Sequence, residues 1–187
     1  MGIPEYSYGI GGRGLSYAID DQDRLVRVDA GFYEFAEENE WDGADHCLGR
    51  SLWDFVAGEE VRRLQRLVVR RLREGRGAVE LGFRCDAPAL RREMELRISS
   101  NPTGRIVLFR TSLRFQHPRR QQPLLDPAAE RGEEVLAMCS WCDRFLVGGA
   151  WVEAEVATAR LDLFRRDSMP ALQHRICEEC DDRLLAA

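Results

Sequence analysis

The sequence contains no lysine, so all 27 of its basic residues are arginines. It has only three histidines, and no apolar run approaches the roughly 20 residues that a membrane-spanning helix needs. It also lacks a glycine-rich phosphate loop, a serine-centred nucleophile elbow and a His/carboxylate metal motif. With few candidate bases and no reaction motif, the sequence predicts a protein that is neither an enzyme nor inserted in a membrane.

The start of the chain and its cysteine content bear on where the protein works. Residues 1–14 lack a positively charged start followed by an apolar stretch, so no signal peptide is predicted. The six cysteines could pair as disulfides, but 187 residues of ordinary apolar content can build a core without them. Cys47 and Cys85 stand alone in apolar surroundings and are predicted to be small buried side chains. We therefore expect a cytoplasmic protein.

The formal net charge is −5, but an acidic start and an acidic tail flank a basic middle. Six arginines between positions 62 and 73 crowd one predicted helix. A basic helix in a protein with a metal motif is compatible with nucleic-acid binding. The net acidity and the lack of aromatic residues among these arginines argue against it. A solvated face, partly paired with the chain's own acids, is the plainer interpretation.

The apolar periodicity of the first two thirds predicts an α+β fold with an antiparallel sheet. Two strands joined by a turn come first, then short helices, one long amphipathic helix, and three further strands. Ser51 is placed to cap one of the short helices. The predicted strands are 16–19, 25–29, 78–86, 91–100 and 105–115, and between them lie helices at 30–39, after Ser51 and at 59–74, with a loop at 41–45.

The last third of the chain is different in composition. Residues 117–129 hold three prolines and a glutamine pair, which predicts a linker. Helices are expected at 130–138 and 151–164. Two C-x-x-C pairs fall in this part, so residues 130–187 are predicted to form a small module stapled by a metal ion.

The two pairs are Cys139 with Cys142 and Cys177 with Cys180. Two intervening residues allow a tight turn that points both thiolates at one metal ion. Four thiolates complete the tetrahedral shell of Zn(II) and leave no open position for catalysis, so the predicted zinc ion is structural. Reduced thiols without metal and a redox switch are the alternatives, although the βαβ context of a thioredoxin-like site is missing. His174 could replace one thiolate, but a second-shell or packing role is the simpler prediction.

The element order, together with Gly49-Arg50-Ser51-Leu52-Trp53-Asp54-Phe55, resembles a PAS domain over residues 14–116. Residues 83–88 and 91–95 are also similar to a subset of bacterial PAS proteins. The resemblance implies a five-stranded sheet in the order 2-1-5-4-3 that cups the short helices and the longer helix. The residues that would line a PAS cavity are Phe32, Phe35, Trp53, Phe55, Phe83, Cys85, Leu96, Ile98 and Phe109.

We expect the apolar residues at these positions to form the hydrophobic core, and a ligand pocket among them is the more specific alternative. Leu52 stands where flavin-adduct PAS domains carry a reactive cysteine, so that photochemistry is not expected. The long predicted helix lacks the histidine that haem PAS domains often place there, and His46 could at most be an off-pattern axial ligand. The ligand of the domain stays unknown from the sequence.

The C-terminal part resembles a cysteine-rich tail that follows PAS or receiver domains in bacterial signalling proteins. The matching residues are Cys139, Trp141, Cys142, Trp151, His174, Ile176, Cys177 and Cys180. Arg175 and Glu178 depart from the usual Gly and Pro of the second turn.

Together the two resemblances imply a bacterial sensory or regulatory protein whose PAS-like domain recognises a ligand or a protein partner. No kinase, cyclase or helix-turn-helix output is visible, so we expect it to act by protein–protein contact, as a homodimer. A nucleic-acid-binding regulator, and a thiol redox sensor from which oxidation ejects zinc, are the alternatives.

Overall fold

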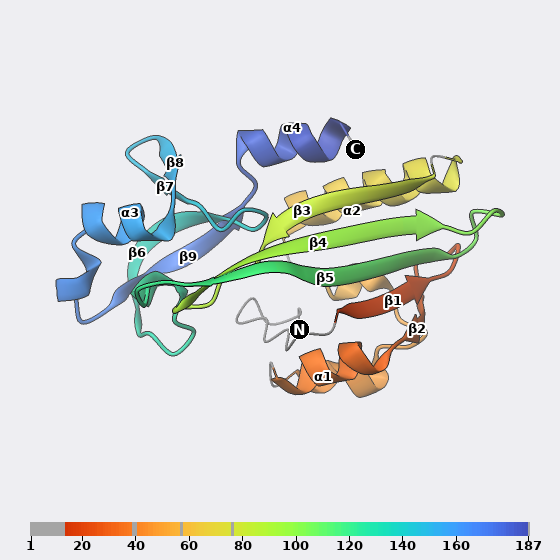
Figure 1. Ribbon diagram of the computed structural model, residues 1–187, viewed down its shortest axis with the longest axis horizontal. Coiled ribbons are helices and arrows are strands. Elements are labelled where there is room, and N and C mark those ends of the chain that lie inside the picture. The colour runs from red at the N-terminus through yellow and green to blue at the C-terminus, as the bar shows by residue number, and fades with distance from the viewer. Residues whose placement is uncertain (1–13, 39–40, 57, 76, 187) are drawn as a thin grey trace.

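Two β-sheets organise the chain, and the last helix crosses from the second sheet back to the first (Figure 1). The structure, a computed structural model, describes residues 14–38, 41–56, 58–75 and 77–186. The predictions made for residues 1–13, for the last residue of the helix at 30–39 and for residue 187 lie outside these ranges.

The first sheet has the strand order β2-β1-β5-β4-β3, and each neighbouring pair is antiparallel. This is the order that the PAS resemblance implied. Its strands are β1 (Leu15–Ile19), β2 (Leu25–Val28), β3 (Ala78–Arg84), β4 (Leu90–Ser100) and β5 (Val107–Pro118). All five predicted strands are present, with ends shifted by a few residues.

Two of the helical elements between β2 and β3 begin at a side-chain cap. Asp29 accepts the Phe32 N–H at 3.0 Å and caps the first helix, and Ser51 accepts the Trp53 N–H at 3.3 Å, as expected. The predicted loop at 41–45 contains a short 3₁₀ helix instead. These elements are α1 (Ala30–Glu38), η1 (Asp42–His46), η2 (Leu52–Asp54) and α2 (Glu59–Arg73).

A first hydrophobic core lies between this sheet and its helices. The amphipathic helix α2 buries Leu64, Val68 and Leu72 against it. Ile98 on β4 and Phe109 on β5 face the same core and are fully buried. The period of the apolar residues in each element therefore sets which face packs inward.

The second sheet has the order β8-β7-β6-β9 and is mixed. Strands β6 and β9 are parallel, so the chain must cross over between them, and it does so through a helical segment. The elements are η3 (Pro123–Leu125), β6 (Arg131–Cys139), β7 (Phe145–Val147), β8 (Ala150–Val152), α3 (Ala154–Arg160), η4 (Leu163–Arg165), β9 (Met169–Arg175) and α4 (Glu178–Ala186).

The helix predicted at 130–138 is wrong, because this segment forms β6. Glu, Leu, Ala and Met favour a helix locally, but pairing with β7 and β9 overrides that preference. The helix predicted at 151–164 is partly wrong, since the segment contains β8, α3 and η4. Strand β9 and helix α4 were not predicted.

The second sheet has its own hydrophobic core. Its buried residues are Leu124, Leu125, Leu136, Met138, Phe145, Ala154, Ala157, Leu163 and Met169. Leu124 and Leu125 come from the stretch predicted as a linker, 117–129, and both are buried here. The division into residues 14–116, 117–129 and 130–187 stays a prediction.

Candidate metal centre

The first cysteine pair lies in the tight turn between β6 and β7. The Cys139 N–H donates to the Arg144 carbonyl at 2.8 Å, and the Asp143 N–H donates to the Cys139 carbonyl at 3.0 Å. The turn requires a left-handed residue, and Asp143 takes this role with φ of 56°. Aspartate is among the few non-glycine residues that adopt this conformation readily. This turn brings Cys142 back beside Cys139.

The second pair lies at the start of α4. Cys177 directly precedes the helix, and Cys180 lies in its first turn. The Asp181 N–H donates to the Cys177 carbonyl at 2.9 Å, and the Cys177 N–H points to the Cys139 sulfur at 3.4 Å. Negative charge is favoured at a helix N-terminus, so this position suits thiolates.

The four sulfur atoms form one compact group. Cys139, Cys142, Cys177 and Cys180 place their Sγ atoms within 4.8 Å of one another, and all six cysteines of the chain are free thiols. The Sγ atoms of Cys142 and Cys177 are 3.8 Å apart. A zinc–sulfur bond of about 2.3 Å gives a tetrahedron with sulfur–sulfur edges of about 3.8 Å. The donor set and its spacing therefore fit a tetrahedral metal ion.

Burial and mutual hydrogen bonding shape the acidity of these thiols. Cys139, Cys177 and Cys180 are buried, and Cys142 is half-buried. Hydrogen bonds from Cys142 and Cys180 lower the pKa of Cys139. The hydrogen bond with Cys139 in turn raises the pKa of Cys142 to about 12 and also raises that of Cys180. Without a cation, repulsion between neighbouring thiolates opposes the ionisation of all four thiols. A divalent ion at the centre compensates this negative charge.

His174 lies on β9, outside the group of four sulfurs. Its Nδ1 is 3.3 Å from the hydroxyl of Ser140, the residue that follows Cys139. Trp151, which the resemblance also singled out, donates its Nε1–H to Glu178 at 2.8 Å. Both residues therefore contact the turns that carry the cysteines.

A network of buried charges lies next to the first cysteine turn. The Asp86 carboxylate is fully buried and binds the guanidinium groups of Arg84 and Arg119, the latter at 3.0 Å. Asp143 accepts the Asp86 N–H at 2.7 Å. Burial, and then the nearby Asp86, raises the pKa of Asp143 to about 8. Arg84 also pairs with Glu153 at 2.6 Å, so the network joins the two sheets.

The residues proposed to line a PAS cavity lie in the first core. Eight of the nine are buried, and Phe83 is half-buried at its edge. Trp41, in the predicted loop, bridges Phe32 and Phe55 in edge-to-face contacts of 5.7 and 5.6 Å. Tyr17 stacks on Phe109 at 4.7 Å. These contacts show a packed aromatic core, and a ligand pocket there stays a prediction.

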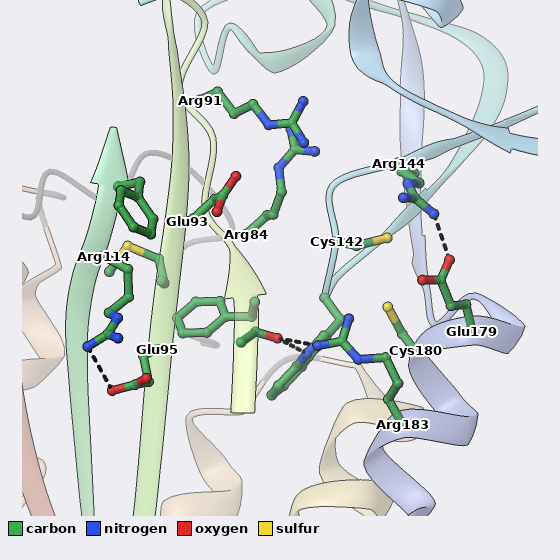
Figure 2. A pocket seen from close by; sticks show the side chains of 15 residues that line it. Arg84, Arg91, Glu93, Glu95, Arg114, Cys142, Arg144, Glu179, Cys180 and Arg183 are labelled. Atoms are coloured by element: carbon green, nitrogen blue, oxygen red, sulfur yellow. Dashed lines mark hydrogen bonds and ion pairs between the residues drawn. The ribbon is translucent and has the colours of Figure 1, made fainter. Parts of the chain in front are cut away.

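A cleft of about 330 Å³ separates the cysteine turns from the ends of β3, β4 and β5 (Figure 2). Phe83, Cys142 and Cys180 are among the residues that line it. Its arginines are engaged with the protein itself: Arg144 pairs with Glu179 at 2.7 Å, and the remaining ones contact carboxylates or a backbone carbonyl. Arginines outnumber glutamates in this lining, although each arginine already contacts a carboxylate or a carbonyl of the protein.

The arginine-rich helix α2 is also largely used within the chain. Arg63 pairs with Asp181 of α4 at 3.0 Å, and Arg71 donates to the Leu185 carbonyl at 2.6 Å. Arg73 pairs with Asp23 at 2.7 Å. These three guanidinium groups are therefore bound to acidic or carbonyl oxygens of the chain itself.

Sequence reasoning missed two features of the site. It did not find the buried network around Asp86, because no motif links that residue to Arg119 or Glu153. It noted Trp141 only as part of the cysteine-rich pattern, although this side chain contacts the first sheet. A large aromatic residue between two metal-binding cysteines was the available signal.

The comparisons with known proteins assign no family. No protein-family model matches the chain, and no curated protein matches it. The crystal structure of a sensory box sensor histidine kinase from Vibrio cholerae is similar with a TM-score of 0.39 and 12% sequence identity, covering 55% of this chain and 82% of that chain. No helix among the described residues is long and apolar enough to cross a membrane.

Proposed function

We propose that the chain is a bacterial sensory or regulatory protein, with a PAS-like domain for a ligand or partner and a structural zinc ion bound by the four cysteines. The observation that carries the proposal is the compact group of four free thiols, three of them buried, at the spacing of a tetrahedral site. Zinc would supply a redox-inert, four-coordinate crosslink with no open position. The strand order of the first sheet supports the PAS-like domain.

Metal analysis of the purified protein, with titration of its thiols, tests the zinc site. We expect one zinc per chain, and spectroscopy of the cobalt-substituted protein should show sulfur ligands alone. Cys180→Ser should lose the metal, whereas Cys85→Ala, a buried cysteine outside the centre, should retain it. Less than about half an equivalent of zinc with all thiols titratable would refute the site.

We propose that the protein acts by contact with other proteins, as a homodimer in the cytoplasm, and without catalysis of its own. The lack of a reaction motif in the sequence supports this. Light scattering at several concentrations tests the dimer. An absorption spectrum of the purified protein distinguishes haem, flavin and a colourless PAS ligand.

Thiol sensing is a second candidate, which the half-buried position of Cys142 favours. Peroxide would oxidise two thiolates to a disulfide, be reduced to water, and release the metal. Zinc release on mild peroxide treatment, reversed by a thiol reductant and added zinc, is the expected result. Retention of zinc under those conditions would contradict this candidate.

A further inference from the structure

The four-cysteine centre belongs to the first hydrophobic core and not to the core of the module that carries it. Cys139, Cys177 and Cys180 are packed with the residues between the first sheet and α2. The second core, between the second sheet and α3, contains none of the cysteines. The buried cluster of the second sheet therefore does not include the thiols, although all four cysteines belong to the module of residues 130–187.

Trp141 attaches the first cysteine turn to the edge of the first sheet. Its indole N–H donates to the Gly82 carbonyl of β3 at 2.9 Å, and its own carbonyl accepts the Arg84 N–H at 2.9 Å. Its ring packs on Phe83 with centroids 5.7 Å apart. Because β3 is an edge strand, these contacts satisfy backbone groups that would otherwise be exposed.

Helix α4 attaches the second cysteine turn to the same region. It lies beside α2, as Figure 1 shows. Leu184 is 2% exposed in the first core, and Arg183 donates to the Gly82 carbonyl at 3.4 Å. Just before the helix, the Ile176 N–H donates to Glu60 of α2 at 2.9 Å.

We propose that the metal is a clasp between the two sheets of the protein: it holds the first cysteine turn and α4 together against β3 and α2. The clasp rests on the zinc site proposed above. Helix α4 has nine residues and directly follows the second cysteine turn. Without the metal, only its contacts with α2 and the Gly82 carbonyl of β3 hold it in place. Isolated helices of this length are marginal in water. Loss of metal therefore releases α4 and uncovers the β3 edge, while the second core stays folded.

Hydrogen exchange of the full-length protein, with its metal and after chelation in reducing buffer, tests the clasp. We expect the amides of α4 and the Arg84 N–H to exchange at least about tenfold faster without metal. The amides of β6, β9 and α3 should keep their protection, and those of β1 and β5 serve as an internal reference.

Two results would overturn the clasp. Unchanged exchange in α4 and at Arg84 would show that the metal does not hold them. Equal loss of protection in β6 and β9 would show that the metal stabilises the second sheet itself. Failure of the zinc site is recognised separately, because the purified protein would then contain no metal and take up none.

A variant that keeps all four cysteines separates docking from metal binding. Leu184→Ala keeps all four candidate ligands and should retain one zinc per chain. It should still raise exchange in α4, because it removes a buried contact between this helix and the first core. Phe164→Ala is the control, since Phe164 is 48% exposed and contacts Arg120 instead. Loss of zinc without faster exchange in Leu184→Ala would contradict the clasp.

Discussion

Replacement of Asp86 by asparagine tests whether the buried charge network stabilises the fold. The carboxylate is fully buried, and it binds Arg84 and Arg119, whose side chains are 10% and 7% exposed. Asparagine keeps the size and one oxygen, which can still accept the Arg92 N–H now bound at 3.0 Å. The substitution therefore removes the charge while it changes the packing little.

The expected cost is about 3 kcal/mol, because removal of one partner of a buried ion pair leaves the other charge uncompensated. Glu153 and Glu155 also contact these arginines and hold the loss toward the low end of that range. Burial by itself opposes the charge of Arg84, but hydrogen bonds with Asp86 and Glu153 outweigh it and raise the pKa of Arg84. Guanidinium groups do not lose their proton at neutral pH, so the substitution leaves buried positive charge with less compensation.

Urea denaturation at neutral pH measures the change in the free energy of unfolding. The matched control is Glu80→Gln, because Glu80 pairs with Arg97 on the surface and both side chains are 53% exposed. That control should lose less than about 1 kcal/mol. If Asp86→Asn cost no more than the control, the network would be a by-product of packing and the reasoning from buried charge would be refuted.

Three further changes test local features. Burial opposes the charge of Asp29, but hydrogen bonds, chiefly from the Ser16 hydroxyl, outweigh it and lower the pKa of Asp29 below 3.8. The stability gained by this charge is therefore present above pH 3.8 and is lost as the pH falls through the lowered pKa. The difference in unfolding free energy between wild type and Asp29→Asn, measured by urea denaturation, should shrink on acidification, and a constant difference would contradict this. Gly104→Ala should cost about 1–3 kcal/mol, because φ is 70° and the added Cβ would lie 2.9 Å from the Arg73 carbonyl; an unchanged melting temperature would argue against it. Ile98→Ala should lose about 2–5 kcal/mol because Ile98 is fully buried, and a loss below 1 kcal/mol in the same assay would mean that the cavity collapses.

The first sheet could be predicted because its signals are local. Alternation in the strands, the apolar stripe of α2 and the cap at Ser51 each depend on residues a few positions apart. The resemblance then supplied the strand order, which no local signal contains. The second sheet could not be predicted, for the opposite reason: the parallel pairing of β6 with β9 joins segments more than 30 residues apart.

The cysteines could be predicted as one group because metal chemistry imposes its own spacing. The place of that group in the fold could not be predicted. The contact between Trp141 and Gly82 spans 59 positions, and the pair of Arg63 with Asp181 spans 118. Nothing in either segment marks the other as its partner, so the spacing alone could not show that the cysteines pack against the first core.

The ionic network attaches the second sheet to the first, and the proposed clasp adds a second attachment that responds to different conditions. The network around Asp86 is ionic and buried, and it contains no cysteine. The proposed clasp depends on the metal and on the thiols being reduced. Asp143 directly follows Cys142, and its carboxyl group accepts the Asp86 N–H, so the network and the proposed clasp meet at a single turn. On this proposal, loss of the metal frees α4 while the ionic network keeps the second sheet in place, and the change is confined to the β3 edge and α2.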